Sequence, residues 1–282
     1  MFAQFLKIIY ISRPHLWLYT LGSFLFGIHV AALRGYTIDF LGTILLTAIV
    51  TVPTNFALYA LNDYYDAVSD SNNPKKNKFE YKAVTNEHWL YNSAIVVLGI
   101  ITVFFISLGD YYLNILFLIW LVAVLLYNAP PFRFKARPGL DMVCAIIYPI
   151  WGVIGYISAG GVISNYWFIL SLFLLSSSFH LYSAIQDIPY DASAGIMTSA
   201  VFISSPTLNI LICMLLVSLA ILPIIQAGLI ITGIVLSIYI IFYSLHLWKV
   251  SFCKNSTQTY QYFIYTHFVV GIITSLSLFM YH

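Results

Sequence analysis

The chain has 282 residues, of which 61% are hydrophobic and only 8% are charged. Soluble globular domains carry about 25% charged residues, so this composition excludes a soluble fold and predicts a polytopic membrane protein. The net charge of +2 comes without a basic patch large enough to follow a phosphate backbone, so we expect no nucleic-acid partner.

Nine apolar runs are long enough to cross a bilayer, which needs roughly 17 to 25 residues. They cover residues 15–33, 40–61, 89–108, 111–128, 140–160, 165–186, 207–226, 229–248 and 260–280. With the N-terminus in the cytoplasm, every Lys and Arg except Arg34 falls in a cytoplasmic segment, as the positive-inside rule requires. We therefore expect an all-α protein with nine transmembrane helices, a cytoplasmic N-terminus and a single domain over residues 1–282.

An acidic motif follows the second apolar run, where Asn62 precedes Asp63, Asp66 and Asp70. On a helix, the spacing i, i+3, i+7 places the three carboxylates on one face. Like charges repel and need a compensating cation, and Mg²⁺ held by carboxylates commonly binds substrate phosphates as well. The motif predicts a diphosphate site at a membrane surface; the alternative is a solvated acidic helix end.

The next predicted cytoplasmic loop, after the fourth apolar run, is basic. Pro130-Pro131 favours extended backbone, in which Arg133, Lys135 and Arg137 alternate and share one side. Three cations on one side suit a diphosphate, although they also suit anionic lipid headgroups. Tyr127 ends the preceding run, where it either donates its hydroxyl to a phosphate or marks the membrane interface.

A second acidic motif, Asp187 and Asp191, lies at the cytoplasmic end of the sixth run in a loop without Lys or Arg. Pro189 predicts that the helix ends or kinks near Asp187. We expect the two motifs to face each other and to hold two Mg²⁺ ions on one diphosphate, against the alternative of a solvated helix end. His180, two helical turns before Asp187, is interpreted as a satisfied interior histidine rather than a lining residue. The lysines at 75–78 are interpreted as a solvated run that sets topology.

These motifs resemble those of the UbiA-type intramembrane prenyltransferases. The first motif fills the pattern Asn-Asp-x-x-Asp-x-x-x-Asp, the second fills Asp-x-x-x-Asp, and Arg13-Pro14 is similar to the family's start. The loop fills Tyr-x-x-Pro-Pro-x-Arg-x-Lys with Tyr127, Pro130, Pro131, Arg133 and Lys135. The resemblance covers nearly the whole chain in order.

The resemblance implies a helical bundle around a central cavity that opens to lipid, and a Mg²⁺-dependent enzyme. Such an enzyme moves an isoprenyl group from an isoprenyl diphosphate to a lipophilic acceptor and releases diphosphate. The resemblance assigns catalysis to Asp63, Asp66, Asp187 and Asp191, and metal binding to these four residues and Asp70. It assigns substrate binding to Asn62, Tyr127, Arg133, Lys135 and Arg137. It also implies a multi-pass protein of the cell (inner) membrane, in contact with lipid, with its active site facing the cytoplasm.

Two segments, Arg133–Asp141 and Ser183–Ile196, resemble lycopene elongases, which prenylate a carotenoid. Gln186 and the run Met197-Thr198-Ser199 depart from that subgroup, so an aromatic acceptor, as in quinone synthesis, is the main alternative. A cation-coupled transporter is an alternative of another class. Transporters place such charges near the midplane and show inverted repeats, whereas these carboxylates lie at span ends on one side.

Overall fold

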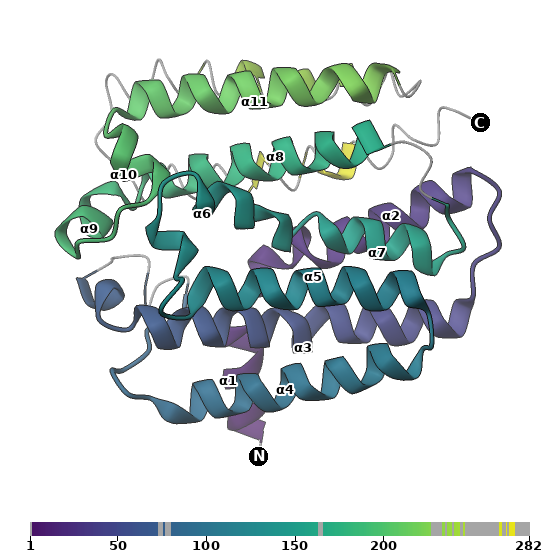
Figure 1. Ribbon diagram of the computed structural model, residues 1–282, viewed down its shortest axis with the longest axis horizontal. Coiled ribbons are helices and arrows are strands. Elements are labelled where there is room, and N and C mark those ends of the chain that lie inside the picture. Colours follow the sequence, from purple (N-terminus) through teal and green to yellow (C-terminus); the bar gives the residue numbers. More distant parts are fainter. Residues whose placement is uncertain are drawn as a thin grey trace. The chain divides into compact units, whose positions relative to one another are not determined.

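A computed structural model of the chain (Figure 1) describes residues 2–72, 76, 80–162 and 166–226. It further describes residues 233–234, 236–238, 240–242, 245, 265–266, 269 and 271–273. Within these residues the regular structure is helical, apart from one isolated β-bridge between Lys76 and Glu80. The chain divides into two compact units, residues 1–134 with 150–161 and residues 135–149 with 162–282, and each is described by itself.

The first unit holds most of the long helices. They are α1 (Phe2–Ile11), η1 (Pro14–Tyr19), α2 (Leu21–Leu33), α3 (Phe40–Asp66), η2 (Ser69–Asn72), α4 (His88–Ser107), α5 (Tyr111–Asn128) and α7 (Ile150–Ser158). Aspartates cap two of them: the Leu41 amide donates to Asp39 at 3.1 Å, and the Leu113 amide donates to Asp110 at 2.9 Å. Gly109, at φ +66°, turns the chain sharply between α4 and α5.

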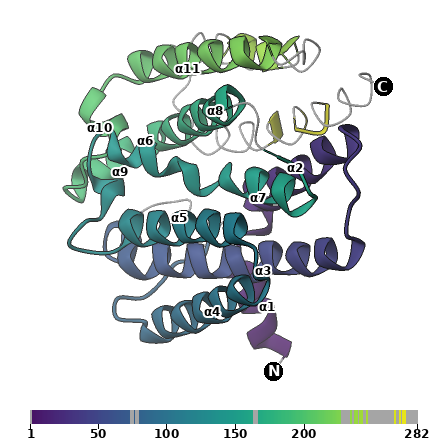
Figure 2. The ribbon, with the colours of Figure 1, turned by 45° about the vertical axis from the view of Figure 1, so that its right-hand side comes forward.

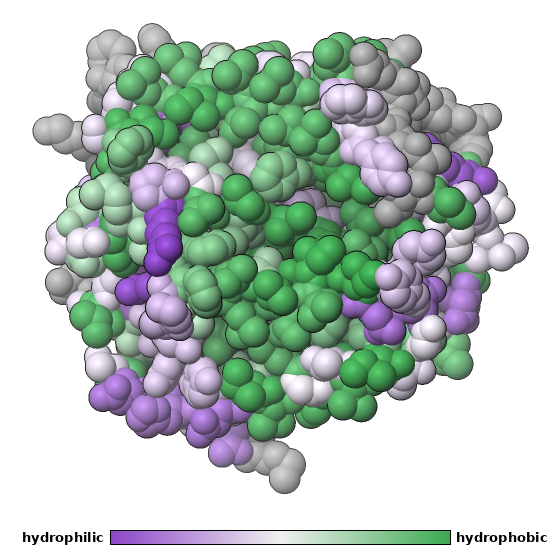
Figure 3. Space-filling model, in the orientation of Figure 1, coloured by the Kyte–Doolittle hydropathy of each residue, from purple (hydrophilic) through white to green (hydrophobic). Residues whose placement is uncertain are grey.

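Close helix contacts hold this unit together. Figures 1 and 2 both show α2 beside α7, and α3 packs against α4 and α5. Trp120 and Trp151 are fully buried and meet edge to face, with their ring centroids 5.2 Å apart. The outward faces of α4 and α5 carry exposed apolar side chains such as Val103 and Leu118, and Figure 3 shows hydrophobic residues over much of the face it draws. Such faces suit contact with lipid tails.

The second unit is built around α8 and α11. Its elements are η3 (Phe134–Ala136), α6 (Leu140–Val143), η4 (Cys144–Ile147), α8 (Tyr166–Ile185), α9 (Ile188–Ser193), α10 (Ser199–Ile203) and α11 (Pro206–Gln226). The Ser178 hydroxyl donates to the Cys213 carbonyl oxygen at 3.0 Å, which ties α8 to α11 inside the apolar core. Buried serines on α8 thus satisfy their hydroxyls on neighbouring backbone.

Within the part of the chain that the structure describes, six helical segments are long and apolar enough to cross a membrane: Pro14–Leu33, Phe40–Asp66, His88–Ser107, Tyr111–Asn128, Leu140–Ser158 and Pro206–Ile225. A shorter apolar helix, Ile169–Ile185, accompanies them. These seven coincide with the first seven predicted runs, so the prediction of an all-helical polytopic membrane protein is confirmed. The predicted runs at 229–248 and 260–280 lie mostly outside the described residues, so the count of nine stays a prediction.

Candidate active site

The first acidic motif lies at the C-terminal end of α3. The helix includes Asp63 and ends at Asp66, whereas Asp70 lies in the separate 3₁₀ turn η2. The prediction that one helix face carries all three carboxylates is therefore wrong. The chain leaves the helical path after Asp66. Asp63 and Asp70 both contact Lys76, whereas Asp66 pairs with Arg133.

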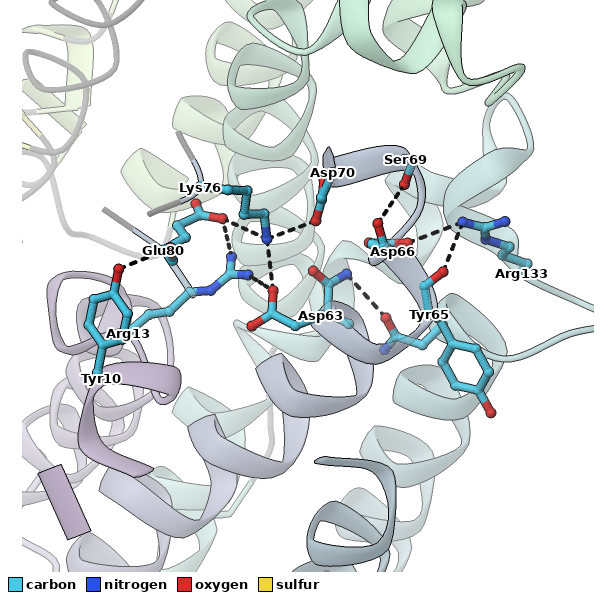
Figure 4. Close-up of polar contacts among 12 residues, drawn as sticks. Tyr10, Arg13, Asp63, Tyr65, Asp66, Ser69, Asp70, Lys76, Glu80 and Arg133 are labelled. Atoms are coloured by element: carbon cyan, nitrogen blue, oxygen red, sulfur yellow. Dashed lines mark hydrogen bonds and ion pairs between the residues drawn. The ribbon is translucent and has the colours of Figure 1, made fainter. Parts of the chain in front are cut away.

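Asp63 is the buried centre of a charged cluster (Figure 4). Its Oδ1 atom accepts from Arg13 Nη2 at 2.6 Å and from Lys76 Nζ at 2.7 Å. Glu80 completes the cluster, with Oε2 2.9 Å from Arg13 Nη1 and 3.2 Å from Lys76 Nζ. Because removing charges from water is costly, such a cluster persists only when opposite charges meet with good geometry.

Lys76 is the residue on which three carboxylates converge. Its Nζ atom lies 2.8 Å from Asp70 Oδ2, in addition to its contacts with Asp63 and Glu80, and its side chain is only 4% exposed. For Lys76, the interpretation as part of a solvated run is therefore wrong, while Lys75 and Lys78 lie outside the described residues. Burial and the Arg13 guanidinium favour a neutral amine, but the carboxylates outweigh them and raise the pKa of Lys76.

Asp66 pairs with a different cation. Arg133 Nη2 lies 3.1 Å from Asp66 Oδ1 and also donates to the Tyr65 carbonyl oxygen at 3.4 Å. Asn62 donates to the Asn128 side chain of α5 at 3.2 Å, which fixes the amide that begins the motif. The structure therefore brings Asn62, Asp66 and Arg133 to one end of α3. Figure 4 shows Asp66 and Arg133 of this group.

The basic loop is not extended as predicted. Phe134–Ala136 forms the 3₁₀ helix η3, and Arg133 has φ 37°. Lys135 is buried, Arg137 is exposed and Arg133 is half-buried, so the three cations differ in their exposure to solvent. Turning backbone replaces the alternation that an extended strand would produce. Tyr127 lies in the last turn of α5 and is half-buried.

The second motif lies in the other unit, where α8 ends at Ile185 and α9 begins at Ile188 with Pro189 in its first turn. The predicted break near Asp187 is confirmed. The Asp191 amide donates to the Asp187 carbonyl oxygen at 2.8 Å, so the two half-buried carboxylates are one helical turn apart. Gln186 is only 8% exposed, and its amide atoms have no hydrogen-bond partner among the described residues.

The donor set of the first motif fits a hard divalent cation. Its ligands are carboxylate oxygens, which Mg²⁺ prefers, and the Oδ2 atom of Asp63 is buried without a donor among the described residues. Within the described residues, no three acidic, histidine or cysteine side chains already converge as a metal cage. The Lys76 ammonium lies at the point between Asp63 and Asp70 that a cation would share.

The sequence does not predict Glu80, Lys76 and Asn128 as site residues. Glu80 and Lys76 lie in a polar loop whose spacing carries no periodic signal, and Asn128 ends an apolar helix. The spacing of four between Lys76 and Glu80, an acid among basic residues, is the one available signal. For Arg13, the sequence offers only the resemblance of Arg13-Pro14 to the start of the UbiA-type prenyltransferases.

Comparison with known proteins agrees with this architecture. The UbiA prenyltransferase family pattern matches residues 20–269. The chain is 33% identical over 193 residues to a lycopene elongase/hydratase of Haloarcula japonica, across 68% of this chain and 65% of that protein. It thus spans slightly less than two thirds of that relative's length. A lycopene elongase/hydratase of Corynebacterium glutamicum is 25% identical over 280 residues, across 96% of both chains.

The fold is similar to that of a UbiA homolog from Archaeoglobus fulgidus bound to DMAPP and Mg²⁺. The TM-score is 0.76 at 17% identity, with 97% of this chain and 98% of that chain covered. The family match extends over most of the chain, and the helices have the length and apolarity of membrane spans. The chain therefore belongs to the UbiA prenyltransferase family and is a multi-pass membrane protein.

Proposed function

We propose that this enzyme transfers an isoprenyl group from an isoprenyl diphosphate to a carotenoid of the lycopene type, with Mg²⁺ as cofactor and release of diphosphate. The observation that carries the proposal is the charged cluster at the end of the membrane-spanning helix α3. Carboxylates and cations suit a diphosphate headgroup with its metal, while the apolar spans suit the hydrocarbon chain. The lycopene elongase/hydratases among the relatives support the carotenoid acceptor.

We assign Mg²⁺ binding to Asp63, Asp66, Asp70, Asp187 and Asp191. The catalytic residues are Asp63, Asp66, Asp187 and Asp191. When bound, Mg²⁺ supplies charge neutralisation for a departing diphosphate. We assign diphosphate binding to Asn62, Tyr127, Arg133, Lys135 and Arg137. We add Arg13 and Lys76 to these residues because they are buried cations that contact Asp63 of the first motif.

The protein's own residues prepare the site for ionisation of the carbon–oxygen bond. Arg133, fixed by Asp66 and by a backbone carbonyl, presents forked donors that suit phosphate oxygens. Lys76 remains an ammonium because its pKa is raised, so its charge is available at neutral pH. Preorganised cations lower the barrier because they need no rearrangement when negative charge develops.

We propose that the protein has nine transmembrane helices in one domain around a central cavity. Its N-terminus and its active site then lie on the cytoplasmic side of the cell (inner) membrane. The described spans and the likeness of fold to a UbiA homolog support this topology. An aromatic acceptor is the second candidate, because Gln186 departs from the lycopene elongase pattern. A cation-coupled transporter is disfavoured by the family match.

The first test is diphosphate release by purified protein in detergent with Mg²⁺ and a panel of isoprenyl diphosphates. Asp66→Asn is expected to lower the rate by at least about 100-fold, because removing one partner of a preorganised electrostatic site costs that much. Removal of Mg²⁺ with EDTA is expected to stop the reaction, and added Mg²⁺ to restore it. Asp39→Asn, at the other end of α3, keeps a helix cap and is the matched control.

The acceptor is tested in bacteria that accumulate lycopene, followed by mass analysis of the pigments. The proposal predicts a gain of one or two isoprenyl groups that disappears with Asp66→Asn. Unchanged pigment, with active enzyme present in the membrane, would transfer the assignment to an aromatic acceptor. Wild-type rates from Asp66→Asn, or a reaction that resists EDTA, would contradict the metal site itself.

A further inference from the structure

A second polar cluster lies in the unit formed by residues 135–149 and 162–282. Asp141, in the first turn of α6, is fully buried, and its Oδ2 atom accepts from the Ser199 amide at 2.8 Å. The Ser199 hydroxyl donates to Oδ1, and the Met142 amide donates to the same atom at 2.9 Å. Several donors directed at one carboxylate favour its ionised form. Asp141 is thus built as a fixed negative charge inside an apolar unit.

His180 of α8 faces this charge. Its Nε2 atom lies 3.8 Å from Asp141 Oδ2, and its side chain is 14% exposed. Among the described residues, His180 is the one basic side chain within 4.0 Å of the Asp141 carboxylate. An imidazole beside a fixed carboxylate can accept a proton at low cost, because the resulting imidazolium is paired as soon as it forms. If His180 were only an interior histidine with its hydrogen bonds satisfied, the donors from Ser199 and Met142 that hold the Asp141 carboxylate would have no explanation.

Side-chain hydrogen bonds fix the two partners relative to each other. The Ser177 hydroxyl donates to the Met142 carbonyl oxygen at 3.1 Å, and the Ser176 hydroxyl donates to the Ala145 carbonyl oxygen at 2.8 Å. Figure 1 shows the resulting contact of α6 with α8, and α10 and α11 pack against α8 as well. Among the described residues, the other titratable groups on the elements that pack most against α8 are the buried thiols of Cys144 and Cys213.

The depth of His180 in the unit suits the hydrocarbon part of a bound donor. His180 precedes Asp187 by seven residues, or about 10 Å along a helix axis, and the turn continues because the Asp187 amide donates to the Ala184 carbonyl oxygen at 3.0 Å. A diphosphate held at Asp187 would have its first carbons a few ångströms further into the apolar region. His180 therefore lies on the apolar side of Asp187, toward the hydrocarbon part of a donor held there.

We propose that His180 is the general base of the reaction and that Asp141 is the residue that positions it, an inference that rests on the proposed function. The donor's C1–O bond breaks and diphosphate leaves with the electron pair. C1 then bonds to an unsaturated carbon of the acceptor, which leaves a carbocation on that acceptor. His180 takes a proton from the carbon next to the cation, and the C–H electron pair forms the double bond of the product. The step needs no further reactant and applies to an alkene or an aromatic acceptor alike.

His180→Gln tests this step in purified enzyme with Mg²⁺, donor and acceptor. Loss of a general base is expected to lower kcat by about 10²- to 10⁴-fold while the donor's KM stays unchanged. His180→Gly is expected to regain part of the rate when imidazole is added, which a structural histidine would not allow.

Two further variants separate positioning from packing. Asp141→Asn is expected to lower kcat with little change in the donor's KM, because the imidazolium loses its partner. Ser176→Ala removes a hydrogen bond between the same elements without touching the pair, and is expected to keep kcat within about twofold. A His180→Gln enzyme with wild-type kcat would overturn the proposal, as would a slow His180→Gly enzyme that imidazole does not rescue. A wild type that releases no diphosphate would instead overturn the proposed function.

Discussion

At the scale of single residues, Lys76 shows how charge is balanced in this protein. Its ammonium contacts Asp63, Asp70 and Glu80 within 3.2 Å and is almost completely buried. A cation that shares two motif carboxylates occupies the kind of position that a divalent ion would take. The residue therefore links the stability of the cluster to the binding of metal.

Lys76→Met tests this link, because it removes the ammonium and leaves the carboxylates uncompensated. Without Mg²⁺ it is expected to lower the free energy of unfolding by about 3–5 kcal/mol, the cost of breaking a buried ion pair. Millimolar Mg²⁺ is expected to raise the melting temperature of the variant more than that of the wild type. Lys82→Met, whose ammonium donates to the Ser71 carbonyl oxygen, is the control. An equal effect of Mg²⁺ on all three proteins would contradict the link.

At the scale of the elements, the contact of α2 with α7 depends on residues without side chains. A Cβ atom on Gly27 would lie 1.9 Å from the Gly152 carbonyl oxygen, and one on Gly155 would lie 2.1 Å from the Phe24 carbonyl oxygen. Between membrane helices, small residues permit this close approach and the packing that holds the helices together. The two helices thus meet backbone to backbone, which no larger residue at these positions allows.

Gly155→Ala tests the contact, because the added methyl group forces the helices apart. The expected loss is about 1–3 kcal/mol of unfolding free energy, the usual cost of overpacking, measured by thermal or denaturant unfolding in detergent. Gly99→Ala on α4 is the matched control, since a Cβ atom there meets nothing within 4 Å. The control is expected to be neutral or to gain about 0.5–1 kcal/mol from helix propensity. Equal stability of Gly155→Ala and wild type would refute the close contact.

At the scale of the whole molecule, the distribution of basic residues predicts the orientation in the membrane. The loop between α2 and α3 holds only Arg34, whereas the loop between α3 and α4 holds four lysines. By the positive-inside rule, the second of these loops faces the cytoplasm. The first acidic motif then faces the cytoplasm as well, since it ends α3.

Labelling with a membrane-impermeant maleimide checks this orientation in a cysteine-free background. Thr37 and Thr85 are both exposed, one in each loop, and form a matched pair. Thr37→Cys is expected to react in intact spheroplasts, and Thr85→Cys only after the membrane is permeabilised. The reverse pattern would show that the N-terminus and the acidic motif face outward.

The helical structure, the membrane location and the paired acidic motifs of this protein can all be predicted from its amino-acid sequence. Backbone groups in lipid must be satisfied within a helix, so long apolar runs such as 89–108 and 111–128 predict α4 and α5 closely. The end of α8 before Pro189 also followed from local chemistry, because proline restricts its neighbours. These are local properties, and local sequence encodes them.

Which polar groups meet depends on the three-dimensional fold. Arg13 reaches Asp63 across 50 residues, and Asp141 faces His180 from another element. Uniformly apolar helices carry little periodicity to indicate which face turns inward, and irregular loops carry none. The burial of Lys76 and the turning backbone at Arg133 depend on distant carboxylates, whose attraction outweighs the cost of burial once the fold brings them together.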